Sequence, residues 1–124
     1  MKKFLIIIIC LLLVGCNNIK TRGLTMEINL EGIDVKVWRC QSDNHEIIKV
    51  VEENYIEDKD DELKGIYQFV FNGVSEGKTT ITCNCLIEDE IVKTSIYYVS
   101  VDNNQFIEYL SKDGDDKVSE PIFK

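Results

Sequence analysis

Short apolar runs, divided by turn residues, constrain this chain more than any other feature. Met26, Ile28 and Leu30 alternate with polar residues, the period expected of a strand with one buried face. The same pattern predicts strands at 26–30, 33–40, 47–51 with a candidate extension at 55–56, 66–71, 79–87 and 91–101. Residues 105–110 form either a last strand or a helical turn, and no stretch predicts an amphipathic helix.

About seven short strands with regular turn signals predict an all-β sandwich or barrel. Because residues 25–110 have the size of an immunoglobulin domain, we expect an immunoglobulin-like antiparallel β-sandwich there. Trp38, the only tryptophan, is expected in its core. Residues 111–124, which are charged and contain the only proline, are expected to form a flexible tail.

The N-terminus predicts export. Lys2 and Lys3 precede eleven apolar residues, 4–14, whereas a membrane-spanning helix needs roughly 20. A basic start and a short apolar stretch are typical of a secretory signal. The motif Leu13-Val14-Gly15-Cys16 resembles the lipobox of bacterial lipoproteins. The alternatives are an ordinary signal peptide and an uncleaved anchor.

The lipobox resemblance implies that residues 1–15 are removed and that Cys16 carries lipid. Residues 16–24 would then be a lipidated tether to the cell membrane, with the domain facing outside the cytoplasm. The signal holds two of the 14 basic residues and none of the 22 acidic ones, so the mature net charge is −10. Such a chain is repelled by nucleic acid and by anionic lipid heads, which leaves the lipid as its membrane contact.

Three cysteines remain in the mature domain, namely Cys40, Cys83 and Cys85. Cys83 and Cys85 lie two apart on one expected strand and therefore share a face. They are either core residues or partners of Cys40 in a disulfide, which can form outside the membrane. A metal site that also uses His45 has suitable ligand types but lacks the usual spacing of zinc ligands.

Other chemistry finds little support in the sequence. His45 is the only histidine, and no nucleophile is paired with a base, so we do not expect an enzyme. Asp58, Asp60 and Glu62 resemble a calcium loop, but that loop also needs a glycine and a late glutamate. We therefore expect a solvated charge run there and no cofactor.

From Trp38 onward the order of features resembles the chagasin-like cysteine-peptidase inhibitors found on bacterial lipoproteins. The matching stretches are Trp38, Ser42-Asp43, Glu46 to Val51, Tyr67 to Phe71, Gly73 to Ile81 and Tyr97 to Asp102. The resemblance covers about residues 25–110. It implies an immunoglobulin-like sandwich that binds papain-like cysteine peptidases through three loops.

The inhibitory motifs of that family are absent from the corresponding segments. Residues 31–36 before Trp38, a single glycine before the phenylalanine strand and an acidic turn after residue 87 take their places. The candidate protein-binding residues are therefore Glu31, Gly32, Asp34, Lys36, Gly65, Glu88 and Asp89. The expected partner is a papain-like peptidase or another envelope protein.

A second resemblance offers an alternative. Glu76-Gly77 followed by residues 79–82 is similar to the end of bacterial immunoglobulin-like modules in surface and adhesion proteins. It implies a non-inhibitory surface module that binds a partner or has a structural role.

Overall fold

The computed structural model describes residues 21–33, 36–61, 64–114 and 120–124. Its strands are β1 (Arg22–Gly23), β2 (Thr25–Ile33), β3 (Val37–Ser42), β4 (Ile48–Glu57), β5 (Lys64–Gly73), β6 (Gly77–Ile87), β7 (Glu90–Val101), β8 (Ile107–Asp113) and β9 (Ile122–Phe123). The expected signal peptide, Cys16 and Asp34 lie outside the described residues, as do residues 16–20 of the expected tether.

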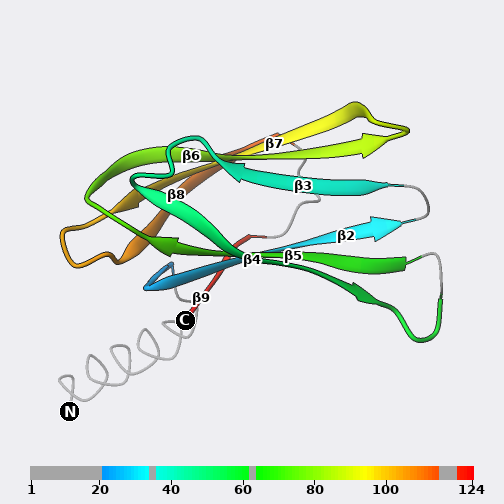
Figure 1. Ribbon diagram of the computed structural model, residues 1–124, viewed down its shortest axis with the longest axis horizontal. Coiled ribbons are helices and arrows are strands. Elements are labelled where there is room, and N and C mark those ends of the chain that lie inside the picture. The colour runs from blue at the N-terminus through cyan, green and yellow to red at the C-terminus, as the bar shows by residue number, and fades with distance from the viewer. Residues whose placement is uncertain (1–20, 34–35, 62–63, 115–119) are drawn as a thin grey trace, which may run out of the picture.

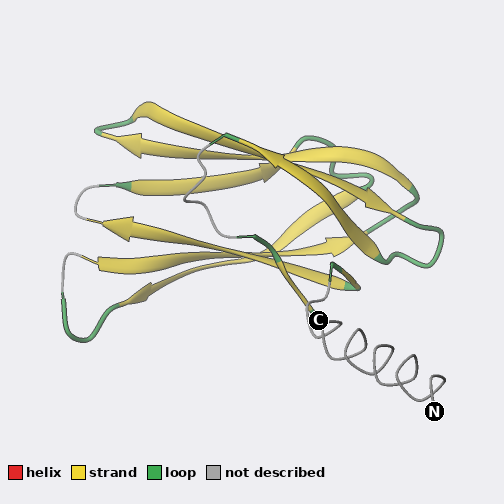
Figure 2. Ribbon diagram, turned by 180° about the vertical axis from the view of Figure 1, so that it is seen from behind, coloured by secondary structure: helices red, strands yellow, loops and turns green. Residues whose placement is uncertain are grey.

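Two antiparallel sheets form a sandwich, which confirms the predicted fold class (Figures 1 and 2). The strand order is β1-β8-β7-β6-β3 in one sheet and β4-β5-β2-β9 in the other. Strands β2, β5 and β4 occupy the places of immunoglobulin strands B, E and D, and β3, β6 and β7 those of C, F and G. Strand β9 lies beside β2, where an immunoglobulin domain has strand A.

The core lies between the sheets because alternate side chains of each strand point inward. Met26, Ile28 and Leu30 are buried, as their spacing predicts. Facing residues such as Ile81, Tyr97 and Val99 are also fully buried. Trp38 is 7% exposed and donates from Nε1 to the Glu31 carbonyl at 3.1 Å, which confirms its expected place in the core.

Several strand boundaries differ from the expected ones. The strand expected at 33–40 is divided, because Ile33 ends β2 and β3 begins at Val37. Strand β4 continues to Glu57. The sequence indicates this continuation only weakly, because a register shift between Val50 and Glu52 interrupts the alternation of buried and exposed residues. Of the two alternatives for residues 105–110, the structure has a strand from Ile107.

The flexible tail expected at 111–124 is wrong in part. Strand β8 continues to Asp113, and Ile122–Phe123 pairs with Met26 and Glu27 as β9. Phe123 is 5% exposed, so burial of its ring stabilises this short strand, which is too brief to show a period in the sequence. At the other terminus, Arg22 and Gly23 belong to β1 and not to a tether.

Candidate functional site

Three connections between strands meet at one end of the sandwich (Figure 1). They join β2 to β3, β4 to β5, and β6 to β7. The register places these strand ends together, since Glu57 and Gly32 both pair with Gly65, and Val37 pairs with Leu86. We call residues 34–36, 58–63 and 88–89 the three-loop end; residues 34–35 and 62–63 lie outside the described residues.

The β6–β7 connection is a tight hairpin. Only Glu88 and Asp89 separate the strands, and both are exposed with positive φ values of 52° and 68°. Two-residue hairpins of this kind favour Asn-Gly, because positive φ is costly for most side chains. The sequence therefore holds two acidic side chains in an unfavourable backbone conformation at the tip of this hairpin.

The glycines expected in binding loops lie in strands. Gly32 and Gly65 are buried and paired with each other, in β2 and β5. The ring of Tyr67 covers Gly32, and the ring of Tyr55 covers Gly65, so that a Cβ at either glycine would meet the ring within 2.6 Å. The two rings pack with centroids 4.6 Å apart, and burial, with a smaller contribution from Tyr55, raises the pKa of Tyr67.

Among the expected site residues, Glu31 also lies in a strand, where it is exposed near the end of β2. Lys36 immediately precedes β3 and is half-buried. The structure therefore leaves Lys36, Glu88 and Asp89 as the described residues of the expected set that lie in connections. Their part in binding remains a prediction.

The β4–β5 connection is short and internally hydrogen-bonded. The Asp58 amide donates to the Lys64 carbonyl at 3.0 Å, and the Lys64 amide donates to Asp61 at 3.1 Å. The Asp60 amide donates to the Asp58 carboxylate at 2.9 Å, a local turn that aspartate favours. Asp58 therefore has a structural role in shaping this loop.

Acidic residues dominate the three-loop end and its bordering strand ends. The acidic residues described there are Glu31, Glu57, Asp58, Asp60, Asp61, Glu88, Asp89 and Glu90, and the basic ones are Lys36, Lys59, Lys64 and Lys93. This excess of negative charge favours a partner with a basic surface and opposes an acidic one.

The opposite end holds the first described strand, β1, and the C-terminus (Figure 1). Arg22 of β1 forms an ion pair with Asp102 and lies over the Phe106 ring, 4.8 Å from its centroid. The Phe106 and Asn104 amides both donate to Asp102 at 2.9 Å. The hydrogen bond from Phe106, followed by the interaction with Arg22, lowers the pKa of Asp102.

Cys40 and Cys83 form a disulfide between directly opposed residues of β3 and β6. This resolves the alternative between Cys83 and Cys85 as partner, and Cys85 is fully buried two residue pairs further along, opposite Trp38. Because the sulfur atoms of Cys40 and Cys83 are joined to each other, these two cysteines cannot act as thiolate ligands in the metal site considered with Cys85 and His45. His45 lies exposed in the turn after β3.

The described residues contain no group of three or more histidine, cysteine, aspartate or glutamate side chains placed to hold a metal ion. Within the same residues, no helix is long and apolar enough to cross a membrane.

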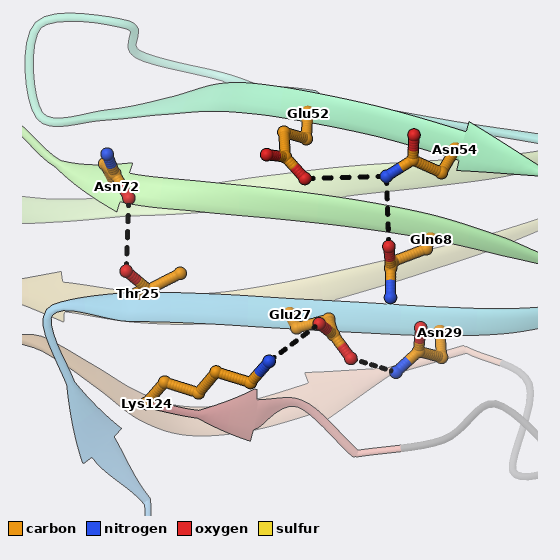
Figure 3. Close-up of polar contacts among 8 residues, drawn as sticks. All are labelled: Thr25, Glu27, Asn29, Glu52, Asn54, Gln68, Asn72 and Lys124. Carbon is orange, nitrogen blue, oxygen red and sulfur yellow. Dashed lines mark hydrogen bonds and ion pairs between the residues drawn. The ribbon is translucent and has the colours of Figure 1, made fainter.

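On the outer face of the four-stranded sheet, polar side chains bond to one another beside the exposed Ile56, Ile66 and Ile122 (Figure 3). Asn54 donates to Gln68 at 3.0 Å, and Asn29 donates to Glu27 at 2.8 Å. Lys124 lies 3.8 Å from Glu27, which joins the C-terminus to this network. Mutually bonded amides and carboxylates are typical of a solvated face.

Comparison with known proteins adds no assignment: no family model, curated protein or solved structure matches this chain.

Proposed function

We propose that the chain is a membrane-anchored lipoprotein that faces outside the cytoplasm and binds a protein through its three-loop end. One observation carries this proposal. Three connections that are distant in sequence gather at one end, and the described chain begins at the other (Figure 1). A lipid on Cys16, a few residues before β1, would therefore leave the three-loop end turned away from the membrane.

The dimensions of the sandwich agree with this orientation. Strand β7 has 12 residues, which at about 3.3 Å each extend over roughly 40 Å. Charges are screened over about 8 Å at physiological salt, so an anionic membrane would not repel acidic loops held that far away. The anchor and the acidic end are thus compatible in one molecule.

The first candidate partner is a papain-like cysteine peptidase. The chagasin-like resemblance implies this partner, and the three segments that correspond to the inhibitory loops of that family all border the three-loop end. The specific contacts would differ from those of the family, because this end carries acidic residues where the family has its motifs. A peptidase with basic residues around its cleft is therefore the preferred target.

Inhibition of papain-like peptidases tests this partner. All described strands lie within residues 22–123, so a soluble chain of residues 17–124 retains them. We expect it to inhibit hydrolysis of a fluorogenic peptide, and we expect Glu88→Lys with Asp89→Lys to weaken inhibition. Glu46→Lys with Glu76→Lys makes the same charge change at exposed positions of the opposite end and serves as the control. Equal loss in both variants would contradict binding by the three-loop end.

A non-inhibitory surface module is the second candidate. The two-residue turn at Glu88 and Asp89 favours it, because so short a connection extends little beyond the strands and offers little to insert into a cleft. Absence of inhibition, together with recovery of an envelope protein that the Glu88→Lys/Asp89→Lys variant fails to recover, would select this candidate over the first.

The anchor has its own test. The mass of the mature protein should correspond to cleavage before Cys16 plus acyl chains, and Cys16→Ser should leave the protein unacylated and poorly retained on membranes. A Cys16→Ser protein that still fractionates with membranes would contradict lipid anchoring.

A further inference from the structure

Strand β4 is exposed on both faces over most of its length. Residues 51–57 are all exposed, with Val51 at 42%, Tyr55 at 45% and Ile56 at 49%. Its neighbour β5, by contrast, buries Phe69 and Phe71 on its inner face. Tyr55 pairs with Tyr67 and shares that inner face, so the opposite sheet does not cover it. A strand in a β-sandwich normally buries the face that packs against the opposite sheet.

A trough follows β4 between the two sheets. Two adjoining cavities of about 340 and 280 Å³ open there, and Arg39 and Glu53 line both. Val50 and Leu86 contribute to the first, and Tyr55 to the second. The trough lies along β3 and β4, which are edge strands of different sheets.

The backbone edge of β4 is also open among the described residues, where β4 pairs only with β5. The sheet has four strands opposite a sheet of five. A bulge between Val50 and Glu52 protects the first part of the edge, since bulges disturb further pairing. No bulge or proline interrupts residues 52–57, which leaves six residues able to pair with another strand.

The charges of β4 select what can pair with it. Strand β4 contains Glu52, Glu53 and Glu57 but only one basic residue, Lys49. Pairing with β4 of a second copy would bring these glutamates together, which is unfavourable for directly opposed like charges. An extended segment with lysine or arginine would instead find opposite charges across the new strand pair.

We propose that the edge of β4 binds an extended segment of a partner protein in which basic residues alternate with apolar ones. The segment would add a fifth strand to the β4 sheet by main-chain hydrogen bonds, with its alternate side chains selecting the sequence. Its inward side chains would enter the trough beside Tyr55 and Glu53. Its outward side chains would lie beside Glu52 and Ile56.

This inference goes beyond the three-loop end and holds whether or not that end binds a peptidase. Strand β4 belongs to one sheet, and the Glu88–Asp89 turn belongs to the other. Substitutions at the two places therefore report on separate surfaces, and either proposal can fail without the other.

The test uses residues 17–124 and a blocked six-residue peptide of alternating lysine and valine. Amide hydrogen exchange by NMR should slow at alternate residues of β4, because only every second amide faces the added strand. A peptide of alternating glutamate and valine is the control for charge. A lysine–valine peptide N-methylated at alternate residues is the control for main-chain pairing, and it should not bind.

Two variants locate the charge requirement. Glu52→Lys with Glu53→Lys should weaken binding of the lysine–valine peptide about threefold or more. The lysines of the peptide share one face, so they oppose either Glu52 or Glu53, and the double variant makes that one exposed charge pair repulsive on whichever face it lies. The matched variant, Glu88→Lys with Asp89→Lys, should bind the peptide as the unchanged chain does. The glutamate–valine and N-methylated control peptides are both tested on the unchanged chain. They therefore test the proposal even if one of the variants folds poorly.

The proposal would be overturned if the lysine–valine peptide showed no binding at about 1 mM, a concentration that corresponds to about −4 kcal/mol of binding free energy. Equal binding of the glutamate–valine or the N-methylated peptide would also overturn it. So would amide protection confined to strands other than β4. Sedimentation that shows a dimer of the chain, with β4 amides protected in that dimer, would identify a second copy as the occupant instead.

Discussion

Removal of the Cys40–Cys83 disulfide should destabilise the domain substantially. The two residues are 43 apart in sequence, and the bridge joins edge strand β3 to β6. By the chain-entropy relation, a loop of this length limits the unfolded chain enough to stabilise the fold by about 4 kcal/mol. A domain of this size has a total stability of about 5–15 kcal/mol, so Cys40→Ala with Cys83→Ala should remove a large part of it.

Urea unfolding of residues 17–124, followed by fluorescence of Trp38, measures the effect. With an m-value of about 2 kcal/mol per M, the unfolding midpoint of the double variant should fall by about 2 M. Cys85→Ala is the control, because it removes a buried thiol and keeps the bridge. Its cost should be about 1 kcal/mol, the usual result of a small core truncation.

Counting thiols in the denatured chain tests the pairing itself. The unchanged chain should show one thiol, Cys85→Ala none, and Cys83→Ala two. The last value follows because Cys40 and Cys85 are diagonal neighbours on adjacent strands, about 7–8 Å apart, beyond the reach of an undistorted disulfide. A Cys83→Ala chain without thiols, or a double variant as stable as Cys85→Ala, would refute this reasoning.

Three further substitutions test other parts of the fold. Replacing Glu88 and Asp89 with Asn-Gly should stabilise the domain by about 1–2 kcal/mol in urea unfolding, because glycine and asparagine tolerate positive φ; no gain would refute the strain. Gly73→Ala should destabilise it by about 1–3 kcal/mol, because a Cβ there would lie 2.4 Å from the backbone oxygen of Gln105; an unchanged melting temperature would contradict this. The lowered pKa of Asp102 means that its stabilisation is present above pH about 3.9, the unfolded value, and is lost as the pH falls through the lower folded value. Asp102→Asn should therefore lower the unfolding midpoint at pH 7, and the difference from the unchanged chain should shrink below pH 4.

The sequence predicts those parts of the fold in which a strand buries one face. Met26, Ile28 and Leu30 alternate with polar residues, and the structure buries all three. The position of the turn at Glu88 and Asp89 was also predictable, since acidic residues interrupt the apolar runs there. The alternation and the turn signal are both properties of neighbouring residues, so they can be predicted without knowledge of the tertiary structure.

The features missed by sequence analysis depend on contacts between distant residues. Strand β4 has no clear alternation after Val51, because neither of its faces is buried there and a register shift separates Val50 from Glu52. The sequence therefore predicts its continuation to Glu57 only as a candidate extension at 55–56. Gly32 and Gly65 resemble loop residues in the sequence, but they lie in strands where tyrosine rings occupy the space of their missing side chains. The adjacent Glu52 and Glu53, which break an apolar run, are of the charged kind that is typical of an exposed edge strand.

The two proposed binding surfaces adjoin each other. Strand β4 ends at Glu57, and the β4–β5 connection of the three-loop end begins with Asp58. A segment paired along residues 52–57 therefore extends directly to the three-loop end without a change of direction. Both surfaces carry excess negative charge, so the same basic partner is favoured at each. A partner that uses both surfaces would lose affinity in the Glu52→Lys/Glu53→Lys and the Glu88→Lys/Asp89→Lys variants, whereas the short lysine–valine peptide would respond only to the first.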